Sequence, residues 1–100
     1  RKSDPEFFRQ LLEISMQNIE KLKQELAENL DKKNIKSIKQ SCHAIKGVAL
    51  NLDFTKLAES CAAIESLENL ELPSQQKTFD EIMKLTDATL DNLRSELDKA

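Results

Sequence analysis

The chain has 100 residues, 39% of them hydrophobic, which is enough for one domain with a buried core. A single glycine, two prolines and no tryptophan or tyrosine favour helices over strands. The net charge of −3 argues against nucleic acid as the main partner, and no apolar run approaches a membrane span or signal-peptide core. We therefore expect a cytoplasmic domain without membrane contact, neither inserted nor exported.

The first predicted helix starts at Pro5, with Asp4 or Ser3 as its N-cap, because proline is well tolerated at the first helical position. Apolar side chains then recur every three or four residues and predict a helix of about seven turns. They are Phe8, Leu11, Leu12, Ile19, Leu22, Leu26 and Leu30. The break at residues 29–34, with the polar corner Asp31-Lys32-Lys33-Asn34, should end it.

The second and third predicted helices are joined by a very short connection. Asn34 should cap the second, whose apolar stripe is Ile35, Ile38, Cys42, Ile45, Ala49 and Leu52. Asp53 should cap the third, whose stripe is Phe54, Leu57, Ala58, Cys61, Ile64 and Leu67. Because the connection is so short, these helices should pack antiparallel.

A fourth predicted helix follows the loop at residues 68–74, with Ser74 as its cap. Its stripe is Phe79, Ile82, Met83, Thr86, Leu90, Leu93 and Leu97. The sequence thus predicts an all-α fold, one antiparallel up-down-up-down four-helix bundle over residues 1–100. A long coiled-coil hairpin is the alternative, but the breaks near residues 31, 53 and 73 disfavour it.

The second helix carries the only histidine, His43, and the only glycine, Gly47. Residues 31–52 hold five lysines and one aspartate, a net charge of +4. Helical spacing places Lys39, Lys46 and Lys36 on the same outward face as His43. Such a face attracts an anionic group or an acidic partner surface.

An exposed imidazole is a nucleophile near neutral pH if a cation lies close and an acceptor holds its other nitrogen. Lys46 can supply the cation, and the hairpin brings either Glu59 or Glu65 to the level of His43. Glycine inside a helix costs roughly 0.5–1 kcal/mol, and Gly47 is explained if it leaves the imidazole open to a second molecule. By itself, however, a single histidine in a helical domain is more often structural or merely exposed.

Other chemistries are disfavoured. Cys42 and Cys61 lie on apolar stripes and are expected to be reduced core residues. One histidine and two core cysteines offer no metal-ligand spacing, so we expect no metal site. No glycine-rich phosphate loop is present, so the chain is not an ATP-dependent kinase by itself.

The run His43-Ala44-Ile45-Lys46-Gly47, followed by Leu52, Phe54, Leu57, Cys61 and Ile64-Glu65, resembles the histidine-phosphotransfer (HPt) domain family over nearly the whole chain. The resemblance implies that His43 accepts a phosphoryl group from a receiver-domain aspartate and passes it to another. It also implies that Lys46 steadies the phosphoryl oxygens, Gly47 gives access and Glu65 orients the ring.

The implied partners are response-regulator receiver domains or a sensor histidine kinase. The chain itself would be a monomer without a cofactor, and the receiver would bring a divalent metal. A stand-alone carrier and a domain of a hybrid sensor kinase both fit.

The chain departs from the family pattern at Asp53, where a turn glycine is usual, and at the apolar Val48 and Leu50 after the glycine. With Lys36 and Lys39, Val48 and Leu50 are the predicted partner-binding residues. Two other functions stay open at this point: a bundle that docks a receiver without phosphotransfer, and a helical adaptor whose histidine is incidental.

Overall fold

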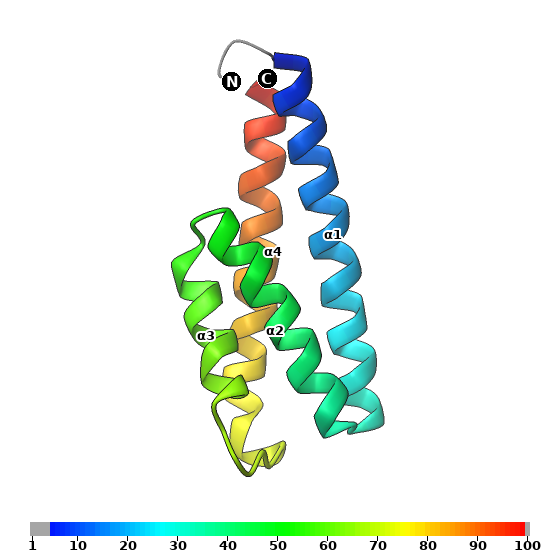
Figure 1. Cartoon of the computed structure of the whole chain (residues 1–100), viewed down its shortest axis with the longest axis vertical. Helices are drawn as coiled ribbons and strands as arrows, with labels where there is room; N and C mark the ends of the chain where they lie inside the picture. Colours follow the sequence, from blue (N-terminus) through cyan, green and yellow to red (C-terminus); the bar gives the residue numbers. More distant parts are fainter. Residues whose placement is uncertain (1–4, 100) are drawn as a thin grey trace.

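A computed structural model describes residues 5–99, which form four α-helices and one short 3₁₀ turn, η1 (Figure 1). Their bounds are α1 Pro5–Lys32, α2 Ile35–Asn51, α3 Thr55–Glu65, η1 Pro73–Gln75 and α4 Gln76–Lys99. Successive helices run in opposite directions, and the principal packing pairs are α1 with α2, α2 with α3, α3 with α4, and α1 with α4. The predicted all-α up-down-up-down four-helix bundle is confirmed.

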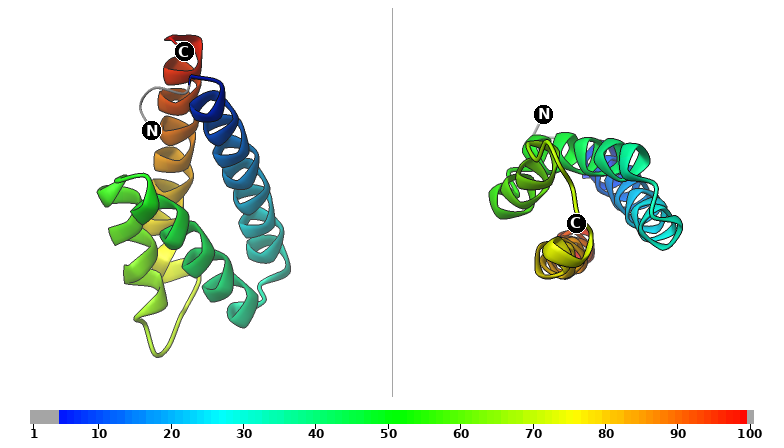
Figure 2. Two further views of the ribbon diagram at one scale, coloured as in Figure 1. Left: turned by 45° about the horizontal axis from the view of Figure 1, so that its top comes forward. Right: turned by 90° about the horizontal axis from the view of Figure 1, so that it is seen from below.

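The four helices differ in length. With 28 and 24 residues, α1 and α4 extend beyond α2 and α3 at the end of the bundle where α1 begins and α4 ends (Figures 1 and 2). None of the helices in residues 5–99 combines the length and apolar character that crossing a membrane requires. The molecule is therefore a four-helix body from which a pair of helices projects.

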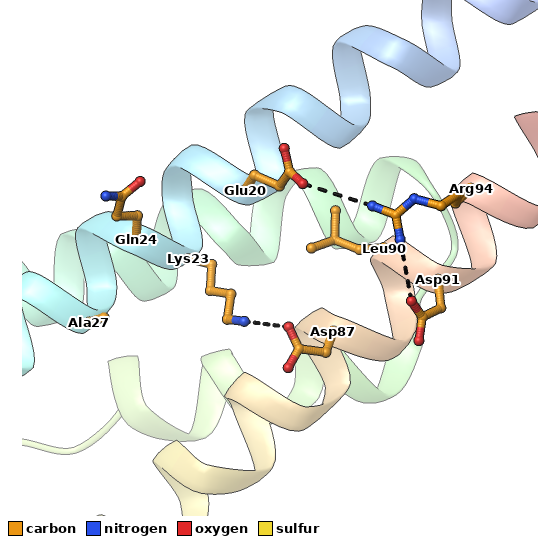
Figure 3. Close-up of a pocket in the computed structure, with 8 residues that line it drawn as sticks. All are labelled: Glu20, Lys23, Gln24, Ala27, Asp87, Leu90, Asp91 and Arg94. Carbon is orange, nitrogen blue, oxygen red and sulfur yellow. Dashed lines mark hydrogen bonds and ion pairs between the residues drawn. The ribbon is translucent and has the colours of Figure 1, made fainter.

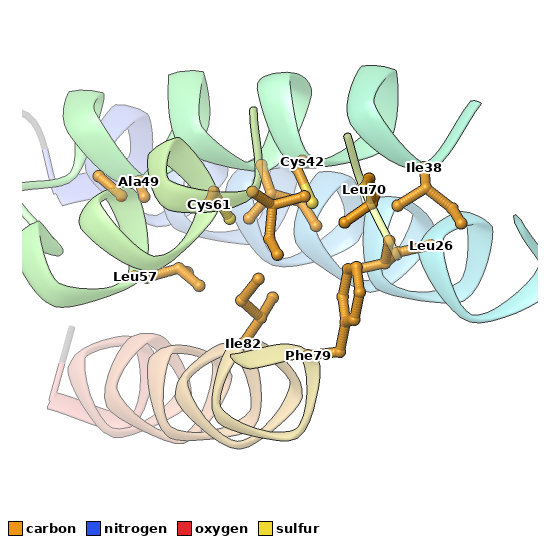
Figure 4. Close-up of a cluster of buried hydrophobic side chains, with 12 residues drawn as sticks. Leu26, Ile38, Cys42, Ala49, Leu57, Cys61, Leu70, Phe79 and Ile82 are labelled. Carbon is orange, nitrogen blue, oxygen red and sulfur yellow. The ribbon is translucent and has the colours of Figure 1, made fainter. Parts of the chain in front are cut away.

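Two clusters of buried side chains form the core. The larger cluster contains side chains from all four helices and from the connection before α4 (Figure 4). Its members are Leu26, Ile38, Cys42, Ile45, Ala49, Leu57, Ala58, Cys61, Ile64, Leu70, Phe79 and Ile82. The smaller joins Leu12 and Ile19 of α1 to Leu90 and Leu93 of α4. Most of the apolar stripes predicted for α2, α3 and α4 are buried as expected, but Ile35, at the first turn of α2, is exposed.

The α1 stripe is only partly buried. Leu12, Ile19 and Leu26 are buried, whereas Phe8 and Leu11, which the sequence pattern placed on the same stripe, are about half exposed. The prediction was wrong at these two positions because the first turns of α1 lie beyond the ends of α2 and α3 (Figure 1). A helix packed mainly on one neighbour buries a narrower stripe than a helix packed between two.

The turns at both ends of α2 show how its position is set. Asn34 is its N-cap, as predicted, and its side chain accepts a hydrogen bond of 3.2 Å from the backbone N–H of Ser37. At the other end, Asp53 adopts a left-handed conformation with φ of 63°, and the next N–H, that of Phe54, donates to the carbonyl of Ala49. This six-to-one bond is the Schellman pattern that ends a helix.

Two predicted caps are therefore corrected. Asp53 ends α2 instead of capping α3, whose N-cap is Phe54 without a side-chain hydrogen bond. Ser74 lies within η1, and α4 starts two residues later at Gln76. In both places the residue that was expected to cap the next helix lies instead in the turn before it. The predicted caps Ser3 and Asp4 lie outside the described residues.

Candidate functional site

His43 projects from the middle of α2, and 70% of its side chain is exposed. Its Nδ1 atom lies 2.6 Å from Oε2 of Glu65, at the C-terminal end of α3. The tight turn between α2 and α3 sets this register, since it makes the helices antiparallel neighbours and brings residues 22 positions apart to the same level. Of the two candidate acceptors, Glu65 and not Glu59 contacts the ring.

Glu65 also forms an ion pair with Lys46, whose Nζ lies 2.6 Å from Oε1. The two carboxylate oxygens therefore hold two side chains of α2 that are one turn apart. Lys46, and more weakly His43, lowers the pKa of Glu65 below its ordinary value of 4.5, against the opposing effect of burial. Glu65 stays ionised until the pH falls below that value, and its side chain is only 22% exposed.

The contact with Glu65 decides which ring nitrogen is available. A carboxylate at Nδ1 favours the tautomer with the proton on Nδ1, because an ionised carboxylate can only accept a hydrogen bond. The lone pair is then on Nε2, at the far side of a mostly exposed ring. The arrangement can therefore present a neutral, oriented nitrogen nucleophile to a second molecule.

Gly47 follows Lys46 on the exposed side of α2. A Cβ atom built on Gly47 would have no atom within 4 Å outside the local helix backbone. No packing within the described chain therefore requires a glycine at this position, although it weakens the helix. The free space is consistent with the predicted access for a partner.

The predicted partner-binding residues are not equivalent. Lys36 and Leu50 are exposed, the latter by 56%. Lys39 is half-buried and donates a hydrogen bond from Nζ to the backbone carbonyl of Leu67, which ties α2 to the segment after α3. Val48 is half-buried against the smaller core cluster. Lys36 and Leu50 thus offer more open surface than Lys39 and Val48.

Cys42 and Cys61 face the core between α2 and α3, behind the site (Figure 4). Both are free thiols with no exposed surface, as the sequence predicted. The hydrogen bond between the two thiols, together with burial, raises the pKa of Cys61, and the same hydrogen bond lowers the pKa of Cys42 against the effect of burial. Because neither sulfur reaches the surface, no second molecule can contact them, and these residues act as packing beneath His43 and Glu65.

A groove between α1 and α4 contains none of the site residues (Figure 3). Its cations are paired: Lys23 binds Asp87, and Arg94 lies 3.5 Å from Asp91 and 4.0 Å from Glu20. The pairs Lys23–Asp87 and Arg94–Glu20 link α1 to α4, and neither cation of the groove is left unpaired to attract an anion. Within residues 5–99, no three His, Cys, Asp or Glu side chains are grouped as a metal site would need.

Sequence reasoning did not foresee that Lys46 pairs with Glu65. The signal was present, because Lys46 is three residues after His43 and both face α3, so one carboxylate can reach both. The bond from Lys39 to the Leu67 carbonyl had no comparable signal, since backbone acceptors in a loop leave no sequence pattern.

Comparisons with known proteins support the resemblance to the HPt domain family. The model of the Hpt domain family matches residues 8–99, which include α1 from Phe8 onward, the other three helices and the residues around His43. No curated protein and no solved structure matches the chain. Since the match covers most of the chain, the protein belongs to the Hpt domain family and is a histidine phosphotransfer module of phosphorelays, in which such domains interact with receiver domains and kinases.

Proposed function

We propose that Nε2 of His43 carries the phosphoryl group between receiver-domain aspartates. The observation that carries the proposal is the 2.6 Å contact from Nδ1 to Glu65, which leaves Nε2 as the free nitrogen of an exposed ring. The match to the Hpt domain family supplies the reaction class.

In this reaction, the Nε2 lone pair attacks the phosphorus of a receiver's aspartyl phosphate from the side opposite the aspartate oxygen. The bond from phosphorus to Nε2 forms as the bond to the aspartate oxygen breaks, and the carboxylate leaves. The ring then carries positive charge, which Glu65 stabilises through the proton on Nδ1. The reverse sequence passes the group to a second receiver.

The neighbouring residues assist in different ways. Lys46 fixes Glu65 in the resting site, and its ammonium is one turn from His43, where it can also steady the phosphoryl oxygens. Gly47 leaves room for the receiver's loops. The positive residues 31–52, with Lys36 and Lys39, attract an acidic receiver face, and Leu50 with the half-buried Val48 adds apolar contact beside it.

The remaining parts of the reaction come from the partner. The receiver would bring the divalent metal, and this chain would need no cofactor of its own. One copy of the chain holds His43, Lys46 and Glu65, so each monomer, with residues 1–100 as its single domain, is the proposed docking unit, and it needs no second copy for transfer. We place the exchange in the cytoplasm, as the charged composition leads us to expect.

The test is incubation of the purified chain with a receiver domain that has been phosphorylated on its aspartate with a radioactive small-molecule donor. Wild type should acquire acid-labile, base-stable phosphate, and His43→Gln should acquire none while still binding the receiver. Lys56→Gln is a control, because Lys56 is an exposed lysine of α3 outside the site, and it should be labelled normally. Receiver binding without label on wild type, across a panel of receivers, would identify a docking module instead.

A further inference from the structure

The first half of α1 carries a line of exposed apolar side chains that phosphotransfer does not use. Phe7, Leu11 and Ile14 are 56%, 48% and 55% exposed, and they follow one another at intervals of four and three residues. Asn18, also exposed, comes four residues later. We call these four residues the α1 seam. It begins in the first turns of α1, which project beyond α2 and α3 (Figures 1 and 2), and runs towards the level of the turn between α2 and α3.

Alternating intervals of four and three are the spacing of the a and d positions of a coiled coil. With Leu11 at a and Ile14 at d, Phe7 is the preceding d and Asn18 the following a. The next d position is Lys21, where the apolar run ends. A single asparagine at an a position is a known device for setting the register and number of strands in a coiled coil.

The flanks of the α1 seam carry no charge. Gln10 and Gln17 occupy the g positions, and Phe8 and Ser15 the e positions. The charged residues of these turns, among them Arg9 and Glu13, lie on other sides of the helix. A basic or acidic partner would find no complementary charge here, whereas two identical seams would meet without repulsion.

We propose that the α1 seam binds the same seam of a second copy of this chain, in a parallel pair about a twofold axis. In this arrangement Leu11 and Ile14 pack against their own counterparts. The Asn18 side chains can hydrogen-bond to each other, which favours parallel, in-register pairing. An antiparallel pair would instead place Asn18 against Phe7.

The surface area makes this a weak dimer. With roughly 100 Å² of apolar surface left on each of Phe7, Phe8, Leu11 and Ile14, one copy presents on the order of 400 Å², as large as the largest apolar patch of an ordinary monomer. Two copies bury on the order of 800 Å², below the roughly 1,200–2,000 Å² of stable interfaces. We therefore expect weak, reversible association that depends on protein concentration.

Pairing would leave the transfer site open. The α1 seam belongs to one helix, while His43 and Glu65 belong to α2 and α3. Two paired copies would each keep the whole site, so one assembly could dock two receivers. The proposal does not depend on phosphotransfer, and His43→Gln should associate like wild type.

Analytical ultracentrifugation of the purified chain over a concentration series tests the proposal. The apparent mass should rise from 11.4 kDa towards twice that value as concentration increases. Leu11→Glu should weaken association by at least about tenfold, because it sets two like charges face to face in an apolar seam. Gln24→Glu, an equal change of charge at an exposed α1 position outside the seam, should have no effect. Circular dichroism should show unchanged helix content in both.

Asn18 tests the orientation. Asn18→Asp should abolish association, and Asn18→Leu should preserve or strengthen it with less control of strand number. A mass of 11.4 kDa at all concentrations, or association unaffected by Leu11→Glu, would overturn the proposal. If the chain stays monomeric and Leu11→Glu instead slows transfer from a receiver, the seam is a receiver contact.

Discussion

The two ends of the bundle are built differently. Around His43 all four helices enclose the larger core cluster, in which Leu26, Ile38 and Ile82 have no exposed surface. At the other end α1 and α4 share the smaller cluster, and neighbouring apolar side chains of α1 remain half exposed. The site therefore stands on a closed core that can hold a side chain in place, whereas the projecting pair of helices is incomplete and offers apolar surface for association.

The largest test of this contrast is a pair of truncations at apolar positions. Ile82→Ala should lower the free energy of unfolding by about 2–5 kcal/mol, because it opens a cavity among fully buried side chains. Leu11→Ala should cost less than about 1 kcal/mol, because Leu11 is already half in water. Urea denaturation measures both.

Dilute protein is needed in that experiment, so that association through α1 does not add to the stability of wild type. If both variants lost the same free energy of unfolding, the two ends of the bundle would be packed alike, and the contrast between them would be wrong.

The same contrast explains what could be predicted from sequence. Where a helix packs between two neighbours, as α2 does, the period of its apolar residues correctly indicated the buried face. The short turn near Asp53 then placed Glu65 beside His43. Phe8 and Leu11 also follow the apolar period of α1, yet both side chains are about half exposed. Their burial would require α2 and α3 to extend as far as the start of α1, and the pattern of one helix does not encode the lengths of its neighbours.

The predicted caps show a second limit. Asp53 is a good N-cap residue by type, yet it ends the preceding helix in a left-handed turn. Aspartate suits both positions because its short polar side chain favours caps and also tolerates positive φ. When only a few residues separate two helices, the type of a residue does not show whether it ends the first helix or begins the second. Here the hydrogen bond from the Phe54 N–H to the Ala49 carbonyl assigns Asp53 to the end of α2.

A second prediction concerns the side chains held on the closed core. Glu65→Ala should slow phosphotransfer by roughly tenfold, at the low end of the ten- to hundredfold that carboxylates contribute when they orient a metal-bound histidine in the same way. Glu65→Gln should lose less, because the amide oxygen still accepts a hydrogen bond from Nδ1 while the charge is removed. Single-turnover transfer from a phosphorylated receiver measures the rates.

Nitrogen NMR of His43 separates orientation from a general loss of structure. The Nδ1-protonated form should predominate in wild type and Glu65→Gln, and the two tautomers should become more evenly populated in Glu65→Ala. If the tautomer ratio is the same in all three proteins, Glu65 does not orient the ring. The position of Glu65 on the closed core would then not decide which nitrogen of His43 reacts.

The smallest expected effect lies at the border of the two regions, in the turn after α2. Asp53→Gly should raise the free energy of unfolding by about 1 kcal/mol or less, because glycine adopts the observed φ of 63° without the steric cost that a side chain incurs. Lys33, with φ of 57° in the turn between α1 and α2, is the matched position, and Lys33→Gly should stabilise the chain similarly. Phe54, next to Asp53, packs against both core clusters, which puts this turn where the closed and projecting parts meet. Urea denaturation measures both variants, and a loss of stability in either would show that the side chain at that turn contributes more than its left-handed backbone costs.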